Sequence, residues 1–326
     1  MLLYATTIYL SAFLLFLIQP IIARYTLPWF GGSPGVWTTC LLFFQVLLLA
    51  GYGYAHLAAR KLDRRTQAVF STVLILLTLA TLPITPSRSL VPEDISMPTW
   101  HILRLLLVSV GACYFLLSST SPLLQSWFSR AHPEASPYRL YMLANLGSLV
   151  AVFGYPFLIE PNLGLNLQTR LWSLAYLVFA VLCTACAWHQ SKSQYALAKV
   201  ETTAPPSSCR AVNPSWKMRL LWLILPALSS MMLLAVTNQL CLDVAVIPLL
   251  WLLPMGLYLL SFILCFHSAR WYSRLAFGIA LTPALAQCTY ILYRGIHVGI
   301  PLQIAPYCLT LFVCCMICHG ELVRFK

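Results

Sequence analysis

The sequence predicts an all-α fold, a polytopic bundle of transmembrane helices. Three observations support this. First, 60% of the 326 residues are hydrophobic and 9% are charged, too few charges to cover a water-soluble surface of this size. Second, the apolar residues form long runs. Third, Lys and Arg fall in the short gaps between these runs, so the net charge of +12 indicates membrane topology rather than a nucleic-acid face.

Ten apolar runs are long enough to cross about 30 Å of hydrocarbon. Backbone groups in lipid must pair within their own segment, so each run is expected to be an α-helix. Pro20, Pro226, Pro254 and Pro283 are expected to kink these helices. The runs are 3–23, 36–58, 66–84, 101–122, 138–159, 170–188, 218–239, 244–266, 274–292 and 299–318.

The positions of Lys and Arg predict the orientation of the bundle. With a cytoplasmic N-terminus, fifteen of these residues lie inside and five lie outside, which is a strong positive-inside bias. Both termini are then cytoplasmic. The outside residues are Arg24, Arg88, Arg104, Arg170 and Arg294.

A polar segment rich in Pro, Ser and Thr separates six predicted helices from four. We expect a six-helix bundle over 1–188, a flexible cytoplasmic linker over 189–217 and a four-helix segment over 218–326. This is how the major facilitator superfamily is laid out, and the loop with Asp63, Arg64 and Arg65 loosely resembles the basic loop of that superfamily. The resemblance implies two further helices after Lys326.

Polar side chains at membrane depth are candidate functional groups, and they are also candidates for hydrogen bonds between helices. Asn145 follows the second interpretation, since Ala144, Gly147, Ser148 and Ala151 form a small face beside it that favours close helix packing. The acids Glu160 and Asp243, with Glu93 and Asp94, fall on the predicted outer side, where they can bind a cation or simply be solvated. The candidate substrate-binding residues are Gln45, Asn145, Glu160, Asn238, Gln239 and Asp243.

Motifs for an independent enzyme are missing from the sequence. It contains no P-loop, no H-E-x-x-H, no G-x-S-x-G and no strand-linked G-x-G-x-x-G, so the chain alone is not expected to catalyse a reaction. Cys315, Cys318 and His319 match the C-x-x-C-H signature of c-type haem attachment. Haem is attached outside the cytoplasm, whereas the charge pattern places this motif inside. Neither a cofactor nor a metal ion is therefore expected.

Several runs occur in an order that is similar to a known family. They are LIQPIIARYTLPWFGGSPGVWTTC, SSTSPLLQSWF, LYMLANLGSLVAVFGYPFLIEPNLG, TNQLCLDVAVIPLLWLLPMGLYLLSFILCF and CHGEL. Together, from Gln19 to Leu322, they resemble the membrane-embedded N-terminal part of bacterial spermidine synthase-like integral membrane proteins, also described as fused major facilitator/spermidine synthase. The matching motif residues are Gln19, Pro20, Gly31, Gly32, Pro34, Trp37, His319 and Glu321.

The resemblance implies a function as well as a fold. In such proteins a cytoplasmic synthase-like domain, which binds decarboxylated S-adenosylmethionine and an amine, follows the helices. No part of this sequence matches that domain, so the chain is expected to be a membrane module without its catalytic part. It would act as an anchor or transport-like scaffold for a cytoplasmic transferase, with the lipid bilayer, a synthase-like protein or domain and a polyamine or other small cation as partners. The alternative is an independent secondary transporter of small amines or metabolites.

Overall fold

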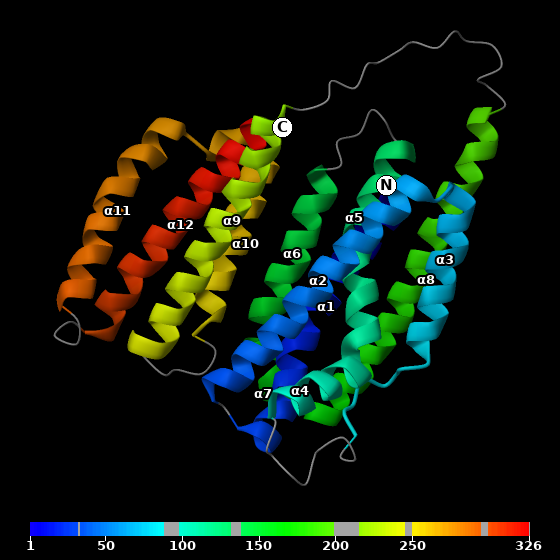
Figure 1. Ribbon diagram of the computed structural model, residues 1–326, viewed down its shortest axis with the longest axis horizontal. Coiled ribbons are helices and arrows are strands. Elements are labelled where there is room, and N and C mark those ends of the chain that lie inside the picture. Colours follow the sequence, from blue (N-terminus) through cyan, green and yellow to red (C-terminus); the bar gives the residue numbers. More distant parts are fainter. Residues whose placement is uncertain are drawn as a thin grey trace. The chain divides into compact units, whose positions relative to one another are not determined.

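The computed structural model describes residues 1–31, 33–87, 98–131, 138–198, 215–244, 250–294 and 299–325. These residues form ten helical segments, and eight helices are long and apolar enough to cross a membrane. The all-helical prediction is therefore confirmed, and the chain is a multi-pass membrane protein. It divides into two compact units, Met1–Pro205 and Pro206–Lys326 (Figure 1).

Unit 1 begins with three helices whose boundaries follow from local sequence. Helix α1 (Leu2–Phe30) ends where Gly31 takes a φ of 77°, a conformation that favours glycine. Pro34 is the first residue of α2 (Pro34–Lys61), where its fixed φ suits a helix start. Asp63 caps α3 (Arg64–Leu79) by accepting from the backbone N–H groups of Arg65 and Thr66.

Two of the other three segments of unit 1 include a short π-helical turn. Helices α4 (Pro98–Leu106) and α5 (Ala112–Ala131) are joined through η2 (Leu107–Gly111). Helix α6 (Tyr138–Gly154) continues through η3 (Tyr155–Ile159) into α7 (Glu160–Asn162). Helix α8 (Leu165–Ala198) closes the unit.

Helix α1 lies at the centre of unit 1, against α5, α6 and α8. Its contact with α6 is the closest, because a Cβ atom added to Gly147 would lie 2.5 Å from the backbone oxygen of Tyr9. Ala144, Ser148 and Ala151 are buried beside this glycine. The predicted small face of α6 is therefore confirmed as a helix-packing surface.

Unit 2 is built around its last helix. Helix α9 (Trp216–Asn238) continues into the π-helical η5 (Gln239–Val244), and α10 (Leu252–His267) follows. A short turn, η6 (Ala269–Trp271), leads to α11 (Arg274–Arg294), and α12 (Ile300–Arg324) packs against α9, α10 and α11 (Figure 1). Helices α9 and α11 keep large apolar side chains exposed, as expected of surfaces that meet lipid.

Several helix boundaries and one predicted kink differ from the sequence prediction. Helix α8 continues to Ala198, into the segment predicted as linker, because the residues after 188 have no helix-breaking Pro or Gly before that point. The helix predicted over 244–266 begins at Leu252 as α10. Pro254 therefore lies in the first turn of α10, where a proline removes no intrahelical hydrogen bond, and the kink predicted there is wrong.

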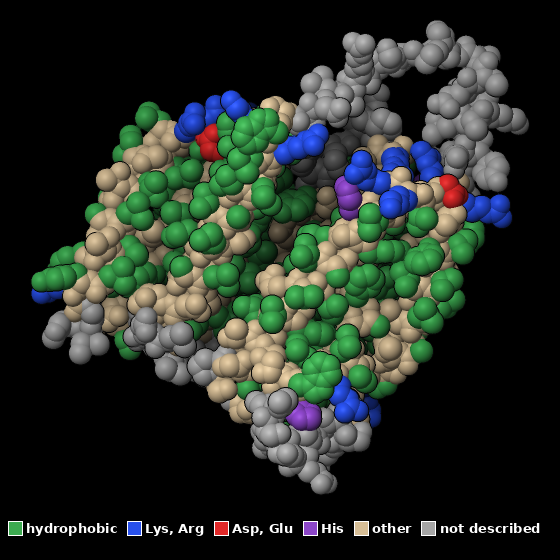
Figure 2. Space-filling view, in the orientation of Figure 1, with side chains coloured by type: hydrophobic (Ala, Val, Ile, Leu, Met, Phe, Trp, Pro, Cys, Tyr) green, Lys and Arg blue, Asp and Glu red, His purple; other side chains and the backbone are tan. Residues whose placement is uncertain are grey.

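Each unit carries its Lys and Arg side chains mainly at one end. In unit 1, Arg60, Lys61, Arg64, Arg65, Arg130 and Arg139 lie where α2, α5 and α8 end, and Arg24, Arg104 and Arg170 lie toward the other end. In unit 2, Lys217, Arg219, Arg270, Arg274 and Arg324 lie where α9 begins and α12 ends, and Arg294 lies at the opposite end of α11. Figure 2 shows basic side chains gathered at one end of each unit.

Candidate functional site

The end of α12 places His319 inside unit 2. Its imidazole is fully buried and is hydrogen-bonded at both nitrogens, by Nδ1 to Ser261 Oγ of α10 at 2.9 Å and by Nε2 to Ser229 Oγ of α9 at 3.1 Å. The ring stacks on Phe262 with centroids 3.6 Å apart and meets Tyr258 edge-on at 5.2 Å. A polar ring is thus held among three helices, with a serine hydroxyl within hydrogen-bond distance of each nitrogen.

Gly320, the next residue, gives the Tyr272 side chain its position. A Cβ atom on Gly320 would lie 2.3 Å from the ring of Tyr272, so the phenol lies directly against the backbone of α12. From there the Tyr272 hydroxyl donates a hydrogen bond of 2.8 Å to Glu321 Oε1. Burial, and then this bond to the carboxylate, raise the pKa of Tyr272 above its usual value. The phenol therefore keeps its proton and stays a donor at neutral pH.

One carboxylate oxygen of Glu321, Oε1, contacts three donor side chains. Besides Tyr272, its Oε1 lies 3.3 Å from Arg274 Nε and 3.5 Å from Arg324 Nη1. The Glu321 side chain is 10% exposed, whereas those of Arg274 and Arg324 are 70% and 54% exposed. Its second oxygen, Oε2, is buried and has no hydrogen-bond partner among the residues that the structure describes. The Glu321 carboxylate is thus buried beneath two guanidinium groups that face outward.

Residues 319–321 therefore connect every helix of unit 2 at one end. His319 contacts α9 and α10, Gly320 and Glu321 contact Tyr272 between η6 and α11, and Glu321 pairs with Arg274, the first residue of α11. Trp222 of α9 donates to the backbone oxygen of Phe325, 2.9 Å away, just after α12. The arrangement is suited to fixing the geometry of a polar surface at the membrane boundary.

A second group of polar contacts lies at the less basic end of unit 1. Gln19 donates to the Tyr114 hydroxyl at 3.4 Å, and the Tyr155 hydroxyl lies 3.5 Å from the backbone oxygen of Pro20 and 3.3 Å from Gln168 Oε1. Arg24 of α1 and Glu160 of α7 form an ion pair at 3.5 Å, with side chains 40% and 30% exposed. Such a half-exposed pair contributes little to stability, but it joins two helices.

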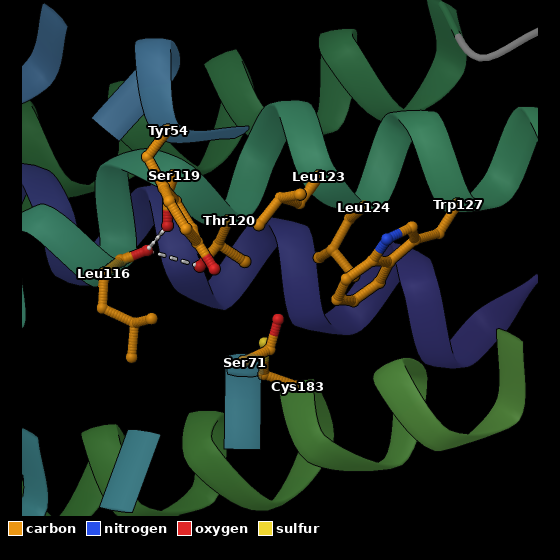
Figure 3. A pocket seen from close by; sticks show the side chains of 9 residues that line it. All are labelled: Tyr54, Ser71, Leu116, Ser119, Thr120, Leu123, Leu124, Trp127 and Cys183. Carbon is orange, nitrogen blue, oxygen red and sulfur yellow. Dashed lines mark hydrogen bonds between the residues drawn. The ribbon is translucent and has the colours of Figure 1, made fainter. Parts of the chain in front are cut away.

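The interior of unit 1 contains a small pocket with a mostly apolar lining (Figure 3). Tyr54 of α2, Ser71 of α3 and Cys183 of α8 face six residues of α5. The cavity volume is about 10 Å³, close to the smallest that holds one water molecule. Ser119 and Thr120 donate to the backbone oxygen of Leu116, as the dashed lines of Figure 3 show. The pocket is too small for a metabolite.

The connection between α2 and α3 is held firmly at the basic end of unit 1. The buried Gln67 amide donates to the backbone oxygens of Ala58 and Leu62, and Trp127 Nε1 donates to Gln67 Oε1 at 2.8 Å. Asp63 accepts from the Thr66 hydroxyl, and this bond is the main cause of the lowered pKa of the Asp63 carboxyl. The loop that resembles the major facilitator motif is therefore a rigid, basic turn.

The remaining predicted residues do not gather into one site within either unit. Gln45 is exposed on α2, and Asn145 on α6 donates to Tyr141 of its own helix at 2.9 Å. Asn238 is exposed at the end of α9, Gln239 is half-buried, and Trp37 is 42% exposed. Gly32, Glu93 and Asp94 lie outside the described residues, as do the side chains of Pro34 and Asp243.

Sequence reasoning missed the partners of the α12 residues. Ser229, Ser261 and Tyr272 were not singled out, because a serine in an apolar run usually bonds to its own helix and a tyrosine in a loop is common. Both serines do bond to their own helices, to Pro226 and Tyr258, while also meeting His319. A signal that could predict such contacts is a serine or threonine in each of two apolar runs, at the same membrane depth as a histidine in a third run.

No family model, curated protein or solved structure matches the chain.

Proposed function

We propose that this multi-pass membrane protein is the membrane module of a spermidine synthase-like system, which anchors a cytoplasmic transferase at the inner membrane. The proposal rests on the unequal charge of the two ends of each unit. Among the described side chains, unit 1 has six Lys and Arg at one end and three at the other, and unit 2 has five at one end and one at the other. The resemblance of residues 19–322 to the membrane part of such proteins suggests that the anchored partner is a synthase-like transferase.

The positive-inside rule gives the orientation. It assigns the two basic ends to the cytoplasm, and with them Met1 and the end of α12. Epitope tags at the two termini test this: in sealed inside-out vesicles both tags are expected to be removed by added protease. Protection of both would reverse the topology and remove the basic ends from the partner.

The basic turn of unit 1 is the proposed docking surface. Arg60, Lys61 and Arg65 are exposed around a connection that Gln67 and Asp63 hold in place, and Arg139 is exposed near the start of α6. A rigid basic surface favours an acidic partner, and complementary charge mainly raises the rate and specificity of association.

The decisive experiment purifies the full chain from its own membranes and measures both the intact mass and aminopropyl transfer by the purified material. A bound or covalently attached synthase-like protein with this activity is expected. Arg60→Gln combined with Arg65→Gln should weaken a non-covalent association, and Arg294→Gln serves as the matched control. A chain of 36.5 kDa that purifies alone and binds neither a transferase nor a polyamine would contradict the proposal.

A second function, transport of small amines or metabolites, is favoured by one observation. The π-helical segments η2, η3 and η5 interrupt three membrane segments, and such turns often accompany functional sites and helix movement. This function predicts uptake of a labelled amine into proteoliposomes that contain the chain alone. Uptake should fall in Gln45→Ala, Asn145→Ala, Glu160→Ala, Asn238→Ala, Gln239→Ala or Asp243→Ala, and absence of uptake would leave the anchoring function.

A further inference from the structure

Two arginine side chains converge at the end of α12. Arg274 and Arg324 each bring one nitrogen within 3.5 Å of the same Glu321 oxygen, so their guanidinium groups are neighbours. One carboxylate balances one of the two positive charges. The group formed by Arg274, Arg324 and Glu321, which we call the arginine notch, therefore carries a net charge of about +1 while Glu321 is ionised.

The positive charge faces outward. The Arg274 and Arg324 side chains are 70% and 54% exposed, while that of Glu321 is 10% exposed beneath them. An anion that approaches the arginine notch meets guanidinium N–H donors before it meets the carboxylate. Each guanidinium has five donors in a planar fork, which matches the oxygens of a phosphate group. The Glu321 contacts leave most of these donors available.

The surroundings of the arginine notch resemble a membrane–water interface. Trp216, Trp222 and Trp271 are 68%, 39% and 55% exposed at this end of unit 2, and interfacial indoles are characteristic of headgroup level. Lys217, Arg219 and Arg270 are exposed at the same end and extend the positive field. The hydrogen bond from Trp222 to Phe325 places the start of α9 beside the end of α12.

An exposed apolar surface continues from the arginine notch along α11. Leu275, directly after Arg274, is 75% exposed, and Ile279, one turn further, is 66% exposed. A ligand that combines a phosphate with an acyl chain can therefore contact guanidinium groups and aliphatic side chains at once. A free phosphate ion would use the charged part alone.

We propose that the arginine notch binds the phosphate of an anionic phospholipid, with an acyl chain lying along α11. This ligand site is independent of the proposed transferase partner and requires only that unit 2 lies in a bilayer. Arg274 and Arg324 hold the phosphate, Glu321 and Tyr272 position Arg274, and Leu275 and Ile279 contact the chain.

Native mass spectrometry of the full chain, released from nanodiscs, tests the proposal. The discs contain equal amounts of phosphatidylglycerol and phosphatidylcholine. The wild type is expected to retain phosphatidylglycerol preferentially. Arg274→Gln combined with Arg324→Gln should weaken that binding by about 30-fold, from about fivefold for each basic residue near an anionic surface. Arg294→Gln, an exposed arginine at the other end of α11, should change it little.

Two further measurements separate the outcomes. Arg270→Gln lies outside the Glu321 ion pairs, so it should lower phosphatidylglycerol binding about fivefold without disturbing the fold, even if the double variant proves unstable. Equal retention of both lipids, or unchanged binding in a folded double variant, would overturn the proposal. Inorganic phosphate that binds the detergent-solubilised chain and is lost in the double variant would show a soluble-anion site, and would overturn the assignment to a lipid.

Discussion

The two units use polar groups in different ways. In unit 1, hydrogen bonds between helices are spread through the bundle and join different pairs of helices. Trp172 of α8 donates to Leu14 of α1, Tyr176 of α8 donates to Thr78 of α3, and Trp127 of α5 donates to Gln67 of α3. In unit 2, most of these contacts involve the central helix α12: residues 319–321 hold one end, and Thr310 donates to Ala284 of α11. Unit 1 should therefore tolerate the loss of a single bond, whereas unit 2 should depend on α12.

The largest effect is expected from a steric change in unit 1. Gly147→Ala places a methyl group 2.5 Å from the backbone oxygen of Tyr9, and neither backbone can move without separating α1 from α6. The free energy of unfolding in detergent should fall by about 3 kcal/mol, the upper part of the usual range for overpacking. Gly154→Ala in the same helix is the control, because its added methyl group would meet no atom within 4 Å. Equal stability of the two variants would contradict the close packing of α1 and α6.

A smaller but more widespread effect is expected from His319→Phe. The aromatic stack with Phe262 can persist, while the hydrogen bonds to Ser229 and Ser261 are lost. We expect the free energy of unfolding to fall by about 1–3 kcal/mol and hydrogen exchange to rise in α9, α10 and α12 together. His267→Phe, at an exposed position that ends α10, is the matched control. Exchange confined to α12 would show that unit 2 does not depend on this histidine.

Gly320→Ala should have an intermediate effect, because the obstructing group is a side chain that can rotate. The Tyr272 ring is expected to leave α12 and to lose its bond to Glu321, at a cost of about 1 kcal/mol. In a double-mutant cycle, Tyr272→Ala should remove most of the penalty of Gly320→Ala. Gly278→Ala in α11 meets no neighbouring atom and controls for helix propensity. A penalty that is the same with and without the Tyr272 ring would contradict the proposed packing.

The smallest effect concerns the cap of α3 and depends on pH. The pKa of Asp63 is lowered in the folded state, so its contribution is complete above the ordinary aspartate pKa of about 4 and is lost as the pH falls through the lowered value. Hydrogen exchange at Arg65 and Thr66, corrected for intrinsic rates, should rise at low pH in the wild type. Asp63→Asn keeps a capping oxygen and should remove this pH dependence, while Asp63→Ala should raise exchange at every pH. Exchange at Arg65 and Thr66 that is as fast in the wild type as in Asp63→Ala at neutral pH would contradict the cap.

The fold was largely predictable from sequence, because a run of about 20 apolar residues has few alternatives in a bilayer. The packing face around Gly147 was also predictable, since small residues at helical spacing have a direct steric meaning. The π-helical turns were not, because they insert a residue without a distinctive residue type. The partners of His319 and Glu321 depend on how far α9, α10 and α11 slide along α12, and a sequence of apolar runs does not specify that register.

Helix α8 is longer than the hydrocarbon layer of a membrane is thick. Helix α8 has 34 residues and is therefore about 51 Å long, against about 30 Å for the hydrocarbon layer. If its first residues lie at one interface, its last turns stand about 20 Å above the other. The last turns of α8 would then lie outside the hydrocarbon layer, so a molecule that contacts them must do so at a distance from the membrane surface.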